Sequence, residues 1–348
     1  MANSFKTFLP EDIANTRTLL HEAIPLTGTI VSGTYGENNI KEYSHGMFQS
    51  VYDYPFLSSS ANHIFDITWG YATGSSLENA ANEQNTKKVN IYNQMALVLN
   101  NLDISGNIKN FDKNGSEDTD TTDDMRECVF ISFARLLNKD EIKKDSFRFT
   151  CFTGSAAEGL QAKNAVIIGD YNGQTNYKTN SPSGEYGLLY TSSTGITDAS
   201  PVGHIYYQAG IAVLTGAIWP HYFGAQDNSS TMTGSVSKML QSGTINQLSD
   251  GLRFFWKGLD FNNTTELNST IYFARAHNTE FNYSSNTTYL SSSQIVVKGN
   301  NPSADPVAYI TSVGLYSPDN ELLAVAKLSE PLKKSPSNEI TLRVRLDF

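Results

Sequence analysis

The sequence predicts a mainly β protein with one long buried helix (α+β), built as a β-sandwich-like body with a C-terminal antiparallel three-stranded unit. Three observations predict this fold. Charged residues make up only 17% of the 348 residues, below the about 25% of an average globular domain. Strand-like runs separated by Gly and Ser follow one another from residue 147 to residue 220. Apolar residues keep a helical spacing over one long stretch only, from Leu77 to Leu99.

The first hundred residues contain two predicted helices. Residues 11–24 predict one short helix that Pro25 ends. The long helix is indicated by apolar residues three and four positions apart, namely Val89, Tyr92, Met95, Ala96 and Leu99. Ile91, Val98 and Leu102 widen this stripe, so we expect burial over more than half of the helix circumference.

The middle of the chain contains its most apolar run, residues 205–219, which follows a polar, acidic surface loop at 103–124. An isolated protein seldom leaves such a run exposed, so Ile205 to Phe223 should be covered by this chain's own core or by a neighbouring subunit. We expect Trp219 and Phe223 to contribute to a subunit interface.

The last forty residues predict three strands. Pro318, Asp319 and Asn320 suit a tight turn, so Val313–Tyr316 and Leu322–Leu328 should pair as a hairpin. The third strand alternates polar residues with five apolar ones, Ile340, Leu342, Val344, Leu346 and Phe348. These five side chains need a cover, which is either the chain's own sheet or another subunit, and we expect a subunit interface there.

Three regions are expected, with one single domain as the alternative. They are an N-terminal region with the long helix (1–145), a β-rich region (146–300) and a C-terminal hairpin plus strand (301–348).

Composition restricts the possible partners. The net charge of -10 argues against nucleic acid, and no apolar run reaches the about 18 residues of a membrane span. The N-terminal stretch lacks the features of a signal peptide, so we expect a protein that is made and used without secretion. Cys128 and Cys151 are expected to be buried thiols on neighbouring strands, because only a short helical connector at 134–145 separates those strands.

No motif predicts catalysis, a cofactor or a metal. The six histidines lack metal-ligand spacing, and both His63, next to Asp66, and His204 are interpreted as satisfied within a β core. Ser235 begins an S-x-x-K pattern without its companion motifs. Paired carboxylates for glycoside cleavage stay possible, since such pairs meet in space and not along the chain.

The end of the chain also resembles a known class of proteins. A strand ending in Gly-Leu-Tyr is followed by an acidic turn, a Leu-Leu-Ala-Val-Ala run, a Pro-Leu-Lys segment and an Arg-rich alternating strand. The matching positions are Gly314, Leu315, Tyr316, Leu322 to Ala326, Pro331, Lys333 and Arg343 to Leu346. This order resembles tail-fibre collar and baseplate-associated proteins of tailed bacteriophages. Segments 19–35, 43–68, 89–99 and 131–147 resemble structural proteins of contractile-tailed marine cyanophages of the myovirus type, and this resemblance spans most of the chain.

The resemblance implies a virion structural protein and carries over no catalytic residue. We expect a non-enzymatic assembly component of the tail, in the baseplate or the tail-fibre attachment region, with a neck, collar or head-surface position as the alternative. Its partners would be other virion proteins and copies of itself in a symmetric assembly. A second hypothesis is a carbohydrate-binding or glycoside-cleaving virion protein, which requires a cleft lined by Trp69, Trp219 or Trp256 and by two carboxyl groups about 5–9.5 Å apart.

Overall fold

The computed structural model describes residues 5–27, 37–74, 77, 83–103, 105–116, 123–153, 165–193, 201–219, 235–283, 290–291, 294–295 and 305–348. Of these residues, 46% lie in strands and 18% in helices, which confirms the mainly β prediction. The chain forms two compact units. We call Leu20–Thr265 the core unit, and Met1–Leu19 together with Glu266–Phe348 the terminal unit.

A seven-stranded antiparallel sheet forms the centre of the core unit. Its strands, in spatial order, are β11 (Tyr186–Leu189), β12 (Gly203–Tyr206), β13 (Ile211–Thr215), β7 (Glu127–Phe133), β4 (His63–Tyr71), β3 (Gln49–Tyr52) and β2 (Ile40–Glu42). The central strands are buried along almost their whole length, because both faces of this sheet are covered.

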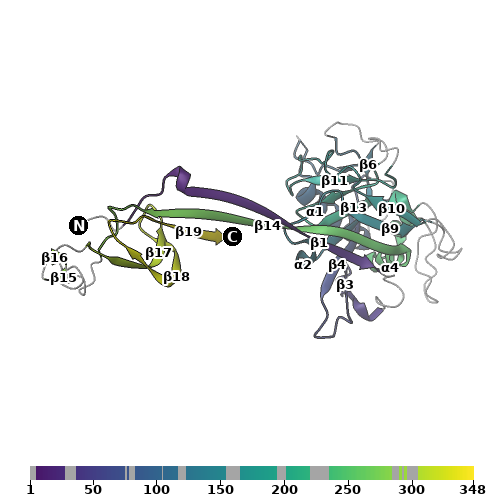
Figure 1. Cartoon of the computed structure of the whole chain (residues 1–348). Coiled ribbons are helices and arrows are strands. Elements are labelled where there is room, and N and C mark those ends of the chain that lie inside the picture. The colour runs from purple at the N-terminus through teal and green to yellow at the C-terminus, as the bar shows by residue number, and fades with distance from the viewer. Residues whose placement is uncertain are drawn as a thin grey trace. The chain divides into compact units, whose positions relative to one another are not determined.

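A second sheet is ordered β1-β14-β9-β10, and β8 also pairs with β14. Its strands are β1 (Ile13–Thr27), β14 (Trp256–Ala276), β9 (Arg148–Phe152), β10 (Ala165–Gly169) and β8 (Glu141–Ile142). The paired strands β1 and β14, purple and green in Figure 1, each belong in part to the core unit and in part to the terminal unit. A small ladder joins β5 (Phe111–Asp112) to β6 (Asp124–Met125).

Four α-helices lie in the described part of the core unit: α1 (Glu83–Leu99), α2 (Arg135–Asn138), α3 (Val236–Ser242) and α4 (Ile245–Phe255). Short 3-10 turns occupy Pro10–Asp12 (η1), Glu37–Asn39 (η2) and Gly216–Ile218 (η5). α4 begins with a capping box, in which the Thr244 hydroxyl accepts from the Gln247 amide at 3.2 Å and the Gln247 side chain accepts from the Thr244 amide at 2.9 Å. The capping box explains why α4 starts immediately after α3 ends.

Helix α1 packs on one face of the seven-stranded sheet. Its Tyr92 ring meets Phe111 at 5.5 Å and Phe130 of β7 at 6.3 Å between centroids, both edge-on. Gly70 of β4 lies under the helix, where a Cβ atom would be 2.8 Å from the carbonyl oxygen of Lys88 and from the amide nitrogen of Tyr92. A residue without a side chain is therefore required at this crossing.

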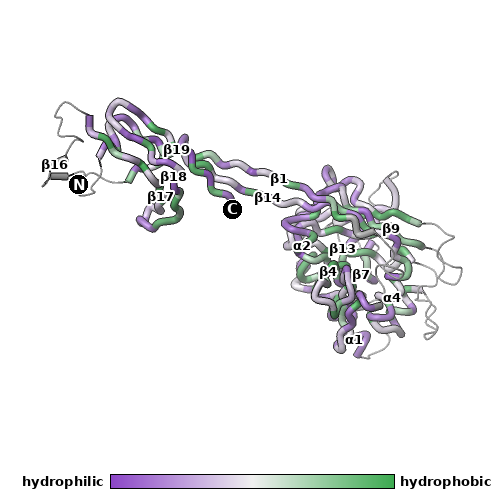
Figure 2. Tube along the Cα trace, turned by 60° about the horizontal axis from the view of Figure 1, so that its bottom comes forward, coloured by the Kyte–Doolittle hydropathy of each residue, from purple (hydrophilic) through white to green (hydrophobic). Residues whose placement is uncertain are grey.

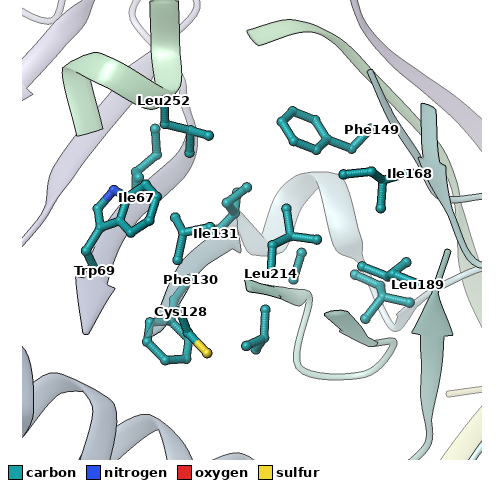
Figure 3. Packing of buried hydrophobic residues seen from close by; sticks show 14 of the residues in the cluster. Ile67, Trp69, Cys128, Phe130, Ile131, Phe149, Ile168, Leu189, Leu214 and Leu252 are labelled. Atoms are coloured by element: carbon teal, nitrogen blue, oxygen red, sulfur yellow. The ribbon is translucent and has the colours of Figure 1, made fainter. Parts of the chain in front are cut away.

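The other face of the seven-stranded sheet packs against the second sheet and α4. Phe65 of β4 stacks on Trp256 of β14 with centroids 4.9 Å apart, and Phe149 of β9 meets the same Trp256 edge-on at 4.6 Å. Figure 3 shows Phe149 and Ile168 directed toward Ile131 across this interior. The core unit is thus sandwich-like, with two packed sheets and a helix on the outer face of one of them.

The expected helix at residues 11–24 is wrong, because residues 13–24 lie in strand β1 and residues 11 and 12 end the 3-10 turn η1. Its local pattern favours a helix, but pairing with β14 overrides that preference. Pro25 lies inside β1 and removes one amide donor, which an edge strand tolerates.

The long helix is confirmed as the longest helix of the described chain, but it begins at Glu83 and not at Leu77. Residues 78–82 lie outside the described residues. Eleven of its seventeen residues are buried or half-buried, in line with the expected burial over more than half of the circumference, although Val98 and Leu102 are exposed. The sheet covers one side of α1, and Lys88 adds contacts with the carbonyl oxygens of Leu240 and Gly243.

The two cysteines do not lie on neighbouring strands. Cys128 belongs to β7 of the seven-stranded sheet and Cys151 to β9 of the second sheet, and both thiols are free and buried. The connector between them forms only the single turn α2 and the short strand β8. Burial raises the pKa of Cys151 to about 12, so the thiol stays protonated and unreactive.

The expected boundaries near residues 145 and 300 do not separate the compact units. Strands β4 and β7 from the first region are in one sheet with β13, β12 and β11 from the second. The division falls instead near residues 19 and 265, inside strands β1 and β14. Long-range strand pairing interleaves regions that are separate in sequence.

The terminal unit contains two small sheets. The predicted hairpin is confirmed and extended, with β17 (Ala308–Tyr316) antiparallel to β18 (Leu322–Lys334). The expected three-stranded C-terminal unit is wrong, because β19 (Ile340–Asp347) pairs with β14 and not with the hairpin. Two short strands, β15 (Leu290–Ser291) and β16 (Gln294–Ile295), also pair with each other.

Candidate interaction surface

The strand β19 shows the alternation that its sequence predicts. It is antiparallel to β14 from Ser269↔Asp347 to Ala276↔Ile340. Four of its apolar side chains are buried or half-buried, while the polar side chains between them are exposed; the four are Ile340, Leu342, Val344 and Leu346. Part of their cover comes from the chain's own strand β14.

Phe348 departs from this pattern. Its backbone exchanges hydrogen bonds with Asn268, donating at 2.8 Å and accepting at 3.2 Å. The side chain nevertheless is 77% exposed. The strand pairing therefore reaches Phe348, but the described part of this chain does not cover its ring.

The terminal unit buries few apolar side chains. Its buried hydrophobic residues among those described are Ile271, Ala276, Ala308, Leu315 and Val344. The large hydrophobic cluster of the protein, by contrast, draws its buried members from Ile40 to Phe261, all in the core unit. The strands of the terminal unit consequently lack the apolar cover that strands of the core unit have.

Large apolar side chains lie instead on the surface of the terminal unit. Thirteen of them are between 37% and 77% exposed: Phe5, Leu9, Ile13, Leu19, Phe281, Tyr283, Tyr309, Tyr316, Leu322, Leu323, Val325, Leu332 and Phe348. Figure 2 shows apolar segments in green along the hairpin and β19. We call these thirteen residues the exposed apolar surface.

The hairpin carries the densest part of this surface. Gly314 pairs with Val325, and Tyr316 pairs with Leu322. A Cβ atom on Gly314 would lie 2.9 Å from the Tyr316 ring and 3.3 Å from Leu322, so these groups share one face. Phe5 packs edge-on against Tyr316 with centroids 4.9 Å apart and covers only part of it.

Polar contacts hold the terminal unit together. Asn15 of β1 accepts from Thr270 of β14 at 2.8 Å, and Arg275 pairs with Asp12 at 2.9 Å. The ammonium group of Lys334, whose side chain is buried, donates to Asn282 Oδ1 at 2.7 Å. Contacts of this kind set geometry more than they add stability, because each replaces a hydrogen bond to water.

The charges of the two units differ strongly. The terminal unit has 9 Lys and Arg against 10 Asp and Glu, a net charge of -1, whereas the core unit has 16 against 25, a net charge of -9. The Lys and Arg side chains of the terminal unit include Arg343 and Arg345, which lie exposed on β19. The exposed apolar surface is thus on the nearly neutral unit.

Trp219 and Phe223 are expected at a subunit interface, but the structure does not place Trp219 at the surface. Trp219 is only 2% exposed, meets Trp69 edge-on at 6.2 Å and donates from its indole nitrogen to the Phe152 carbonyl at 3.1 Å. The described part of the run, 205–219, is largely buried in the core unit, as predicted. Trp219 therefore belongs to the core and offers no surface to a partner, and Phe223 lies outside the described residues.

A second surface feature combines polar and aromatic groups at strands β3 and β4 of the core unit. Asp66 Oδ1 accepts from the Ser50 hydroxyl at 2.5 Å and lies 2.8 Å from His63 Nε2. Tyr43 lies 3.3 Å from Ser50, and the rings of Tyr52 and His63 are 5.6 Å apart. His63 is a third exposed, so the expectation that it lies inside the core is wrong.

The order of these groups does not match a catalytic triad. A nucleophilic serine needs a histidine between itself and the carboxylate, whereas here the carboxylate of Asp66 lies between Ser50 and His63. Ser235 of the S-x-x-K pattern caps helix α3 by accepting from the Lys238 amide at 3.5 Å. Both motifs thus have structural explanations.

The described part of the core unit also buries ionisable groups with structural roles. The Lys88 ammonium donates to the carbonyl oxygens of Leu240 at 2.5 Å and Gly243 at 2.6 Å, at the end of α3. Burial lowers the pKa of Lys88 to about 8. His204 is buried as predicted, with its pKa lowered to about 4 by burial, and is neutral at pH 7.

Asp170 is the third such group. Its carboxylate accepts from the backbone amides of Asp145 at 2.6 Å and Phe147 at 2.9 Å, and from the Tyr207 hydroxyl at 3.2 Å. Burial raises the pKa of Asp170 to about 7. These contacts connect the end of β10 to the loop before β9, which indicates a role in holding that loop.

The cleft required for the glycosidase hypothesis does not involve the tryptophans. Trp69, Trp219 and Trp256 are all buried in the core unit, so none lines an open groove.

No helix in the described ranges is long and apolar enough to cross a membrane. Comparisons with protein-family models, curated proteins and solved structures gave no match to this chain.

The exposed apolar surface is the feature that sequence analysis finds only in part. The sequence predicts a partner contact for Phe348, but it predicts only a hairpin for Leu322, Leu323 and Val325. The signal for their exposure is the adjacent pair Leu322-Leu323 within an alternating strand, since two neighbouring apolar residues cannot both face one covered side.

Proposed function

We propose that this protein is a non-enzymatic structural component of a phage virion, in the baseplate or tail-fibre attachment region of the tail. In this proposal the core unit is a folded body, and the terminal unit is the element that attaches it to neighbouring subunits. It is made in the host cytoplasm and assembled there into particles. The proposal combines the resemblance of the sequence to virion proteins with the properties of the terminal unit.

The exposed apolar surface is the observation that carries this proposal. Soluble monomers rarely expose large contiguous apolar patches, and larger ones mark interaction sites. Thirteen large apolar residues are exposed on a unit with five buried ones among its described residues. A subunit whose apolar side chains are buried only on assembly has many exposed and few buried apolar residues as a single chain, because a neighbouring subunit buries them.

The nearly neutral charge of the terminal unit supports a protein partner. Nucleic acid or an anionic membrane surface would favour a basic patch, and the net charge of this unit is -1. Mixed charges next to apolar side chains are typical of the rim and centre of protein interfaces.

Particles of the phage that encodes this chain provide the test. Mass spectrometry of gradient-purified virions should detect the chain at a fixed copy number. A cryo-EM map of the same virions should show it in the baseplate or fibre attachment region, with the exposed apolar surface against neighbours. Absence of the chain from purified particles contradicts the proposal. Density for the chain at the neck, collar or head surface contradicts the tail position and supports the alternative position instead.

Carbohydrate binding is a second candidate, favoured by the Ser50, His63 and Asp66 cluster. Aromatic rings of Tyr43 and Tyr52 beside hydroxyl and carboxylate groups suit a sugar ring, which has apolar faces and polar edges. Titration calorimetry with polysaccharide purified from the host surface would test it. Equal heats for the wild type and for Tyr52→Ala would contradict binding at this site.

A further inference from the structure

We propose that the terminal unit binds the terminal unit of a second copy of this chain, with the exposed apolar surfaces of the two copies buried against each other. This inference rests on the proposed function of the terminal unit as an attachment element. It names the first partner of that unit.

The described part of the terminal unit buries little apolar surface for the length of the unit. The terminal unit spans residues 1–19 and 266–348, about the size of a small domain. Ordering a chain of that length costs about 1–2 kcal/mol per residue in backbone entropy, which buried apolar surface must offset. The five buried apolar residues in its described part include two alanines, so the described residues supply little of this offset within the single chain.

The open apolar area of the terminal unit is comparable with that of an interface. The thirteen residues lie on several segments of the unit; together they leave on the order of 1,000 Å² open, of which the six aromatic residues, at about 150–250 Å² each, supply about half. A standard interface buries about 800 Å² per partner. The summed open area therefore reaches the size of one side of such an interface.

The net charges of the two units favour a copy as the partner of the terminal unit. Two core units, each with a net charge of -9, repel each other, whereas two terminal units, each at -1, do not. Electrostatic repulsion therefore opposes contact between two terminal units less than contact between two core units. Most soluble oligomers are symmetric assemblies of one chain, and a surface that is both apolar and nearly neutral can cover itself.

Apolar side chains of the terminal unit lie on open strands. Strand β19 pairs with β14 alone, and β17 pairs with β18 alone, among the strands that the structure describes. Edge strands that stay exposed in a monomer usually have charges or prolines against pairing. The second half of β18 has such residues, with Lys327, Glu330, Pro331 and Lys333, whereas its first half, directly after the turn, is the apolar run Leu322–Val325. The first half of β18 therefore fits a segment that is covered in the native assembly.

The test measures the mass of the full-length chain in solution by size-exclusion chromatography with light scattering. We expect the wild type to have at least twice its chain mass of 38.3 kDa at micromolar concentration. The variant Leu323→Asp with Val325→Asp places two charges in the exposed apolar surface and should have the monomer mass. Tryptophan fluorescence should remain native in this variant, because all three tryptophans lie in the core unit.

A matched control places the same charges on the core unit. Leu57 and Leu136 are 88% and 80% exposed, and Leu57→Asp with Leu136→Asp should leave the oligomer mass unchanged. A wild type that stays monomeric up to about 100 μM overturns the inference, and so does a control that dissociates while the terminal-unit variant does not. If the chain is monomeric in solution but present in purified virions, this inference is wrong and the proposed function stands. If the chain is oligomeric but absent from virions, the proposed function is wrong and this inference stands.

Discussion

In the core unit an apolar side chain on a strand meets a helix or a second sheet, whereas in the terminal unit many such side chains meet solvent. Phe130 of β7 lies under α1, with Tyr92 and Phe111 around it. Leu323 of β18 also lies on an antiparallel strand, yet it is 67% exposed. Both segments are rich in apolar residues that favour strands. Their side chains differ in exposure because a helix covers β7, whereas no layer of the described chain covers Leu323.

One chain thus combines a unit that covers its own apolar strands with a unit that leaves many apolar side chains exposed. The core unit closes its hydrophobic cluster with its own residues, so its stability should not depend on assembly. The terminal unit leaves thirteen large apolar side chains exposed among its described residues. Assembly would then add burial without rearranging the core unit.

The largest effect is expected for Phe130→Ala. Removing this buried ring leaves a cavity against Tyr92 and Phe111, so the free energy of unfolding should fall by about 3–5 kcal/mol. Urea unfolding followed by tryptophan fluorescence measures it. Leu57→Ala on the surface of the core unit should change the same quantity by about 0.5 kcal/mol or less. Similar losses for both variants would contradict a tightly packed core unit.

A second effect of about 3 kcal/mol is expected from the buried charge of Lys88. Its pKa is about 8 in the folded protein against 10.5 as the ordinary value, so between these pH values the unfolded chain holds one more proton. The contribution of Lys88 to stability therefore rises with pH from 8 to 10.5 and is lost as pH falls through 8.

The test compares the free energy of unfolding of the wild type with that of Lys88→Met across this pH range. The difference should shift by about 3 kcal/mol in favour of the wild type as pH rises. Leu57→Ala, which removes no ionisable group from the surface of the core unit, should give a constant difference over the same range. A constant difference for Lys88→Met as well would show that burial does not shift its titration.

The third effect concerns the close approach of α1 to β4. A methyl group in Gly70→Ala would lie 2.8 Å from backbone atoms of Lys88 and Tyr92, so helix and strand must separate, at a cost of about 1–3 kcal/mol. Gly258→Ala in β14 is the control, because no atom lies within 4 Å of the place that its methyl group would take. Thermal unfolding of the two variants should differ by several degrees, and equal melting temperatures would argue against this helix position.

The smallest effect on the core unit is expected from removing β19. A chain ending at Ser335 loses the strand that pairs with Ser269–Ala276, while the hydrophobic cluster from Ile40 to Phe261 stays complete. The free energy of unfolding, measured by urea unfolding followed by tryptophan fluorescence, should change by less than about 1 kcal/mol. Loss of the cooperative fluorescence transition in this variant would show that the two units unfold as one, and the contrast between them would not hold.

Local sequence patterns predicted those features that depend on neighbours in the chain. The mainly β composition, the hairpin around residues 313–328, the alternation from Ile340 to Leu346 and the buried run 205–219 follow from turn residues and apolar spacing. These patterns also indicated where a cover is needed, since a half-apolar strand has one face to bury. They could not say which surface supplies it.

The long-range partners of these segments follow from the tertiary structure alone. Residues 13–24 are a strand because β14 pairs with them, and β19 pairs with that same β14 and not with the adjacent hairpin. Cys128 and Cys151 are in different sheets for the same reason. The free energy of strand pairing comes from residues far away in the chain, whereas local propensity differs by less than about 1 kcal/mol per residue, so a distant partner overrides the local preference.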